Sequence, residues 1–188
     1  MGTRNVTIIR YNGKERVRQY GQWDGYPTAA LASIVDFLKT DGAIEKLKKN
    51  VMKCKLVSEE KFKYPANFEG IAREVLKDYV SDLRNKTFEE KLCCSVIYTK
   101  TEMFEYYLAT RDTGYNIPDI LITSAADEAN EIVLQKAYTD KCDWQIEAVN
   151  IIDLDVGMVT SYWHGAEANF GFNCLPTMEQ LEKFESEG

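Results

Sequence analysis

Histidine is nearly absent from this chain of 188 residues, in which His164 is the sole copy. A mechanism or a metal site that needs two histidines is therefore excluded. The five cysteines form an odd set, and no pair of them has C-x-x-C spacing, so neither a complete disulfide framework nor a clustered zinc site is indicated. We expect buried or half-buried free thiols in a reducing cytoplasm.

Long hydrophobic runs and positive charge are also scarce. No apolar stretch is long enough to span a bilayer, and the first residues lack the apolar core of a signal peptide. The chain has 23 Lys and Arg against 30 Asp and Glu, which gives a net charge of −7. Non-specific nucleic-acid binding needs a basic face. We therefore expect a cytoplasmic protein that does not bind a membrane and has no direct non-specific nucleic-acid binding, although an acidic protein can compete with nucleic acid for a basic partner.

The remaining composition is that of a globular protein, with 45% hydrophobic and 28% charged residues. No internal repeat, low-complexity tract or Gly/Ser/Pro-rich linker divides the chain. We therefore predict one domain over residues 1–188.

Two pairs of β-prone segments lie near the ends of the chain. Strands near 5–11 and 15–20 flank Asn12-Gly13, which suits a type I′ hairpin turn because both central residues need positive φ. Segments 144–153 and 158–163 flank Asp155 and Gly157, which supply a second turn. These two hairpins predict an antiparallel four-stranded sheet.

Helical spacing of apolar residues and capping signals predict helices between and after the hairpins. A first helix is expected from Pro27 to near Gly42, and a second begins at an Asp41 cap and has Ile44 and Leu47 inward. Three further helices are expected over 67–80, 87–92 and 101–110. A last helix begins at Thr177 and has Met178, Leu181 and Phe184 inward. The segment 119–123 is either a short helix or another apolar segment. We predict an α+β fold with the helices packed on one face of the sheet.

The densest group of polar and aromatic residues is the stretch 19–27, Gln-Tyr-Gly-Gln-Trp-Asp-Gly-Tyr-Pro, where a strand gives way to a helix. A helix start offers unpaired backbone N–H groups to an anionic ligand, although Asp24 could satisfy them itself. Trp23 and Tyr26 are either recognition surfaces or aromatic plugs of the core.

Two further motifs carry weaker signals. Asp112-Thr113-Gly114 is similar to half of an aspartic protease site, but its single copy and its helix-to-loop context favour a helix end with a left-handed Gly114. Trp163-His164-Gly165 follows a predicted strand, where a lone histidine is more often a hydrogen-bonded surface residue than a catalyst. No nucleotide-binding, metalloprotease or nucleophile-elbow motif occurs. We expect no metal and no cofactor.

Four motifs occur in order: Thr3-Arg4, the 19–27 stretch, 111–114, and Asp143-Trp144 leading to 152–155. In this the chain resembles a family of small uncharacterised proteins from bacteriophages, bacteria and some fungi, which open with Gly-Thr-Arg and carry Gln-Trp-Asp-Gly-Tyr-Pro. The family more often has Glu-Trp-x-Tyr where this chain has Asp-Trp-Gln-Ile at 143–146. The resemblance implies a shared fold and a phage-like context. The family motifs fall on residues that core packing explains poorly, and these are the candidate ligand- or partner-binding residues: Arg4, Gln22, Trp23, Asp24, Tyr26, Arg111 and Asp112.

Two functions are compatible with these residues. The first is a non-enzymatic binding protein of a phage or mobile element that occupies a host protein or a small anionic ligand, for example an anti-CRISPR-like inhibitor of host defence. The second is a small hydrolase or transferase, distantly like N-terminal-nucleophile enzymes, with Asp24 as a base and Arg4 or Arg111 holding an anion. Without a catalytic signature the first is favoured. In both, the 22–26 loop lies beside Arg4 and Arg111, and one arginine can pair with Asp24.

Overall fold

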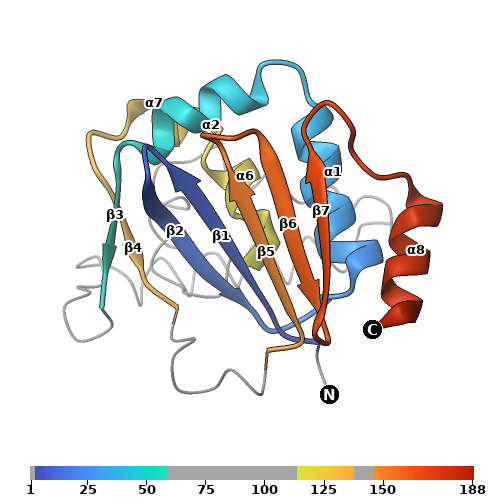
Figure 1. The fold of residues 1–188 in the computed structure, drawn as a ribbon. Coiled ribbons are helices and arrows are strands. Elements are labelled where there is room, and N and C mark those ends of the chain that lie inside the picture. The colour runs from blue at the N-terminus through green and yellow to red at the C-terminus, as the bar shows by residue number, and fades with distance from the viewer. Residues whose placement is uncertain (1–2, 59–113, 138–145) are drawn as a thin grey trace, which may run out of the picture.

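A five-stranded sheet, in the order β2-β1-β5-β6-β7, forms the centre of the computed structural model, which describes residues 3–58, 114–137 and 146–188 (Figure 1). The strands are β1 (Asn5–Tyr11), β2 (Lys14–Gly21), β5 (Ala148–Asp153), β6 (Met158–Trp163) and β7 (Ala166–Gly171). Strands β1 and β5 pair in parallel, and the other neighbours pair antiparallel. The predicted α+β class is confirmed, and both terminal regions supply strands to the same sheet.

The opening hairpin is confirmed. Strands β1 and β2 pair through Asn12 and Gly13, whose φ angles of 53° and 64° are the positive values that a type I′ turn requires. The second predicted turn also forms, with Gly157 at a φ of 69°. The expected sheet was wholly antiparallel and one strand short. The parallel pairing of β1 with β5 joins distant segments and leaves no local sequence signal. Strand β7 was missed because it alternates small and polar residues and lacks the β-branched residues that signal a strand.

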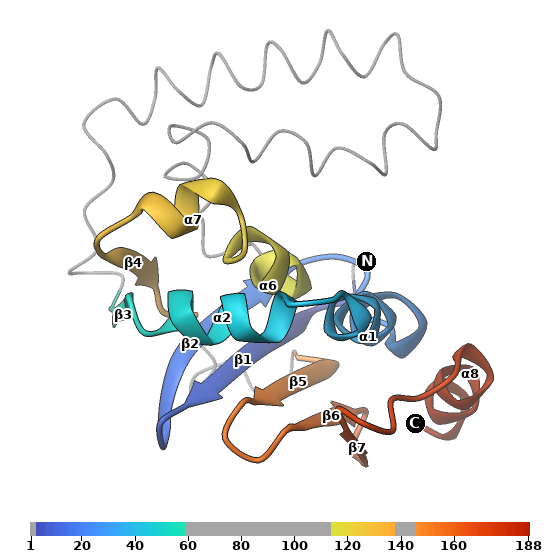
Figure 2. The ribbon, with the colours of Figure 1, turned by 90° about the horizontal axis from the view of Figure 1, so that it is seen from above.

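Helices lie on one face of the sheet and at one of its sides. They are η1 (Pro27–Leu31), α1 (Ala32–Lys39), α2 (Ala43–Val51), η4 (Gly114–Asn116), α6 (Ile117–Ile120), α7 (Ser124–Glu128) and α8 (Met178–Glu187). Seen from above, α1, α2 and α6 cover the same face, whereas α8 lies next to β7 at the edge (Figure 2). The helices predicted over 67–80, 87–92 and 101–110 lie outside the described residues.

Helix ends show both successes and errors of the sequence prediction. The capping box of α8 is present, with the Thr177 N–H donating to Gln180 Oε1 at 2.8 Å and the Gln180 N–H donating to Thr177 Oγ1 at 3.3 Å. Asp41 does not cap α2, because the left-handed Gly42 occupies that position. Met178 was expected inward but is 53% exposed, whereas Leu181 and Phe184 are buried as expected.

The core between sheet and helices is mostly aliphatic. It includes Ile9 and Ile152 from the sheet, Leu31 and Ile34 from the first helices, and Ile117 from α6. At one level along the strands the sheet is polar instead, because strand pairing places four buried polar residues side by side: Gln19, Thr7, Asn150 and Ser161. The Ser161 hydroxyl donates to Asn150 Oδ1 at 2.8 Å. Hydrophobic periodicity does not predict such a polar level inside the core.

A second, two-stranded sheet lies beyond β2. Strands β3 (Cys54–Val57) and β4 (Ile132–Gln135) pair in parallel, and neither was expected. Burial raises the pKa of the Cys54 thiol to about 12, so this buried thiol stays protonated. The expectation of buried or half-buried thiols is wrong for Cys174, which is exposed because it follows the end of β7. The other cysteines lie outside the described residues.

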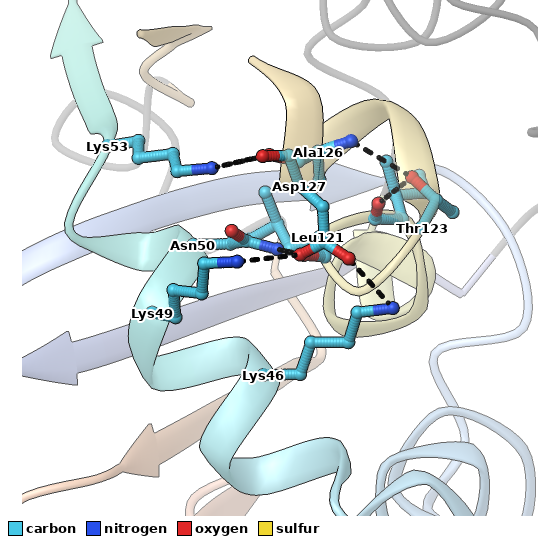
Figure 3. A network of polar contacts seen from close by, with 9 residues as sticks. Lys46, Lys49, Asn50, Lys53, Leu121, Thr123, Ala126 and Asp127 are labelled. Carbon is cyan, nitrogen blue, oxygen red and sulfur yellow. Dashed lines mark hydrogen bonds and ion pairs between the residues drawn. The ribbon is translucent and has the colours of Figure 1, made fainter. Parts of the chain in front are cut away.

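Helix α7 is held against α2 by lysines that converge on one carboxylate (Figure 3). Asp127 accepts the side-chain N–H of buried Asn50 at 2.9 Å and forms an ion pair with Lys46 at 3.0 Å. Lys53 Nζ donates to two carbonyl oxygens of α7 at 2.9 Å each. The Asn50 hydrogen bond, followed by the lysines, lowers the pKa of Asp127. The network fixes the 114–137 segment on α2.

None of the helices in the described ranges is both long and apolar enough to cross a membrane.

Candidate functional site

The segments that carry the candidate residues meet at one end of the sheet, here called the loop end. Strand register aligns five neighbouring positions there: Gly21, Asn5, Ala148, Trp163 and Ala166. The 22–26 loop, the start of β1, the start of β5 and the 163–165 turn therefore lie together. The opposite end, with the 12–13 and 154–157 turns, is called the hairpin end.

The 22–26 loop packs directly on the backbone that leads into β1. The Gly25 N–H donates to the Thr3 carbonyl at 3.0 Å. A Cβ on Gly25 would lie 2.9 Å from that oxygen and 3.2 Å from the Arg4 carbonyl carbon, so the close approach requires glycine. The loop thus runs beside Arg4, as the sequence analysis expected.

Asn5 anchors the loop from inside the protein. It is completely buried, and its Nδ2 donates to the Trp23 carbonyl at 3.1 Å and to the Gly21 carbonyl at 3.4 Å. A buried amide that bonds one carbonyl of the loop and one at the end of β2 fixes the loop more firmly than a solvent-exposed contact would. Asn5 is not among the residues predicted for the site, because an asparagine at the start of a strand carries no distinctive sequence signal.

Two glycines make room for the Asn5 side chain. A Cβ on Gly21 would lie 2.8 Å from Asn5 Nδ2, and a Cβ on Gly114 would lie 3.0 Å from the Gly21 Cα. Gly114 also has a φ of +51°, as predicted for the glycine of the 111–114 motif. The structure therefore brings the end of that motif onto the base of the 22–26 loop. Arg111 and Asp112 themselves lie outside the described residues.

The outer side of the loop exposes aromatic side chains. Trp23 is 64% exposed and Tyr26 is 43% exposed, so neither plugs the core. The Tyr26 ring packs at a tilt on Trp163, with centroids 5.8 Å apart, whereas Trp23 projects from the middle of the loop. Exposed aromatic residues on a fixed loop are typical of recognition surfaces.

Asp24 separates the two aromatic residues and is itself exposed. Its φ of 53° is left-handed, a conformation that few residues other than glycine adopt and that Asp tolerates. Among the described residues it forms no ion pair. Nearby Tyr115 has its pKa raised by burial and then by the negative charge of Asp24. The Asp24 carboxylate therefore acts on Tyr115.

The ion pair of Arg4 is with Glu147 rather than with Asp24. The Arg4 backbone N–H donates to Glu147 Oε2 at 2.8 Å, and Arg4 Nε lies 3.6 Å from the same oxygen. Glu147 immediately precedes β5, so this contact ties the starts of two parallel strands together. Gln22 accepts a hydrogen bond from the Tyr20 hydroxyl at 2.6 Å, which fixes the first residue of the loop.

Hydrogen-bond acceptors of the chain itself bond the backbone N–H groups at the start of η1, the helix that follows the loop. Glu185 Oε2 accepts the Thr28 N–H at 3.0 Å and the Thr28 hydroxyl at 2.6 Å. The next two N–H groups donate to the Tyr26 carbonyl at 2.9 and 2.8 Å. The expected anion site at this helix start is thus occupied by the protein, and Glu185 rather than Asp24 occupies it.

The 163–165 turn lies beside the same loop. The Trp163 Nε1–H donates to the Glu185 carbonyl at 3.0 Å, and the His164 ring meets the Trp163 ring edge-on at 4.2 Å. The His164 N–H donates to the Glu147 carbonyl at 3.1 Å. The 19–27 stretch and the Trp163-His164-Gly165 motif, about 140 positions apart in the chain, are therefore neighbours, which only strand pairing could decide.

Comparisons with known proteins do not assign this chain to a family. No family model matches the chain, and neither a curated protein nor a solved structure matches it. Within the described ranges, His, Cys, Asp and Glu side chains do not gather in groups of three that could hold a metal ion. The arrangement is that of a fixed loop that presents two aromatic rings and one carboxylate to solvent.

Proposed function

We propose that this chain is a non-enzymatic binding protein whose contact surface is the 22–26 loop. The observation that carries this proposal is the 64% exposure of Trp23 on a loop that buried Asn5 and the Gly25 N–H hold in place. Tryptophan is enriched among the residues that dominate binding energy at protein interfaces. A loop that is already fixed also loses little conformational entropy when a partner binds.

The charge of the chain restricts the partner. Helix α8 contacts η1 next to the loop and carries four glutamates against one lysine. Together with the net charge of −7, this favours a partner with a basic surface, because complementary charge accelerates association and selects the partner. In its most concrete form the protein is a phage-encoded cytoplasmic inhibitor of a host defence protein, of the anti-CRISPR type, that covers a basic nucleic-acid groove.

An affinity capture experiment tests this function. The tagged chain, its Trp23→Ala variant and a Val156→Ala variant are each exposed to a bacterial lysate at low salt, and retained proteins are identified by mass spectrometry. Val156 is a suitable control because it is 67% exposed at the hairpin end, away from the loop. We expect wild type and Val156→Ala to retain the same protein and Trp23→Ala to lose it. Equal retention by all three chains would disprove the role of the loop.

A further inference from the structure

We infer that the 22–26 loop recognises a cationic side chain, arginine above all, on a protein partner. This inference rests on the proposed function and specifies the chemistry that the loop binds. It follows from three groups that the loop presents together: the exposed ring of Trp23, the exposed ring of Tyr26 and the carboxylate of Asp24 between them.

The aromatic part of this surface suits a cation. The face of an indole attracts a guanidinium or ammonium group, and an arginine plane can also stack on it. Trp23 has the area for this contact, because nearly two thirds of it is exposed at 64%. Tyr26 is held by its packing on Trp163, so a second ring is fixed at the same surface.

The carboxylate provides the opposite charge. Asp24 is exposed, and in the described part of the chain its carboxylate makes no ion pair, in contrast to Glu147, which pairs with Arg4, and Glu185, which bonds Thr28. Those two carboxylates are bonded within the fold, whereas Asp24 is exposed to solvent. A carboxylate can bind a guanidinium through two parallel hydrogen bonds, which a lysine cannot reproduce.

The backbone holds Asp24 in place from both sides. Asp24 adopts a φ of 53°, between the hydrogen-bonded Trp23 carbonyl and the Gly25 N–H that donates to Thr3. Aspartate is one of the few residues other than glycine that tolerate this left-handed conformation. The carboxylate is therefore carried by a backbone that is already fixed, so little conformational entropy is lost when it binds a cation.

Selection from a random dodecapeptide library tests the inference even while the partner is unidentified. The full chain is immobilised as wild type, as Asp24→Asn and as Asp41→Asn. Asp41 is exposed between α1 and α2, so its substitution changes the net charge equally but away from the loop. We expect peptides selected by wild type and by Asp41→Asn to be enriched in arginine, and the enrichment to be lost with Asp24→Asn.

A selected peptide then separates charge from shape. Replacing its arginine by citrulline, which is neutral and nearly isosteric, should weaken binding to wild type by about tenfold or more. It should weaken binding to Asp24→Asn by a smaller factor, because only the attraction between the cation and the aromatic rings remains to be lost there. The inference is overturned if no peptide is selected, if the selected peptides lack arginine enrichment, or if citrulline binds as tightly. In each of these cases, loss of a lysate protein by Trp23→Ala would still support the proposed function, so the two failures are distinguishable.

Discussion

At the hairpin end of the sheet, both carboxylate oxygens of Asp155 accept backbone hydrogen bonds, from the Asn12 and Gly13 N–H groups, at 2.8 Å each. At the loop end, Asn5 donates to two carbonyls of the neighbouring strand and loop. Each end therefore uses one side chain to fix a turn that belongs to another strand. The difference is that the anchor at the hairpin end is exposed, whereas the anchor at the loop end is buried.

This difference explains what each end can present to a partner. At the hairpin end the exposed carboxylate of Asp155 is used by the turn itself. At the loop end the anchor is buried, and the outer side chains, Trp23 and Asp24, are exposed, with no ion pair at Asp24 among the described residues. Stability and recognition are thus assigned to different residues at the loop end, and five substitutions test that separation.

The largest effect is expected at Gly25. Gly25→Val places a Cβ 2.9 Å from the Thr3 carbonyl oxygen, and because backbone cannot move aside easily, the loss should be about 3 kcal/mol in the free energy of unfolding. Gly171→Val is the control, since no atom lies within 4 Å of a Cβ at that position in β7. Chemical denaturation measures both, and equal stability of the two variants would contradict the packing of the loop.

Asn5→Ala should follow with a loss of about 2 kcal/mol, because the Trp23 and Gly21 carbonyls lose their buried donor. Asn169→Ala, an exposed asparagine on β7, should lose less than about 0.5 kcal/mol. Hydrogen exchange at the Gly25 amide should accelerate in Asn5→Ala. Unchanged exchange there would show that Asn5 does not anchor the loop.

At the hairpin end, Gly13→Val should cost about 1 kcal/mol or more, since a β-branched side chain resists the φ of 64°. Gly13→Asn should cost less, because asparagine tolerates positive φ. Thermal unfolding compares the two variants. Equal melting temperatures for Gly13→Val and wild type would argue against the turn.

The anchor at the hairpin end should depend on pH. The backbone hydrogen bonds from Gly13 and then Asn12 lower the pKa of Asp155, so the folded state favours the ionised carboxylate. Its stabilising effect is present above the ordinary pKa of about 4 and is lost as the pH falls through the lower folded value. The melting temperature of Asp155→Asn should be below that of wild type at pH 7, and the gap should close in acid. A constant gap would contradict this.

The smallest effect on stability is expected for Trp23→Ala, at less than about 0.5 kcal/mol, because the side chain is 64% exposed. The same variant should lose binding if the proposed function is correct. A large destabilisation would instead assign Trp23 to the structure of the loop and would remove the separation between the two ends.

Local signals predicted part of the fold correctly. The Asn12-Gly13 turn and the Thr177–Gln180 capping box formed as expected because both depend on residues close in sequence. Strand β7 and the pair of β3 with β4 were missed, since their short segments carry weak β-propensity or depend on a distant partner. Asp41 was wrong as a cap because glycine at 42 already allowed the left-handed start of α2.

For the candidate site, the order of residues is enough to establish which positions of the 22–26 loop are polar, aromatic or glycine, and therefore which chemistry the loop can present. The folded arrangement was needed to show that Trp23 and Tyr26 face solvent, that Arg4 pairs with Glu147, and that Glu185 fills the helix start. Sequence spacing cannot reveal the last two outcomes, because they depend on the parallel pairing of β1 with β5 and on the packing of α8, which join segments more than 100 residues apart.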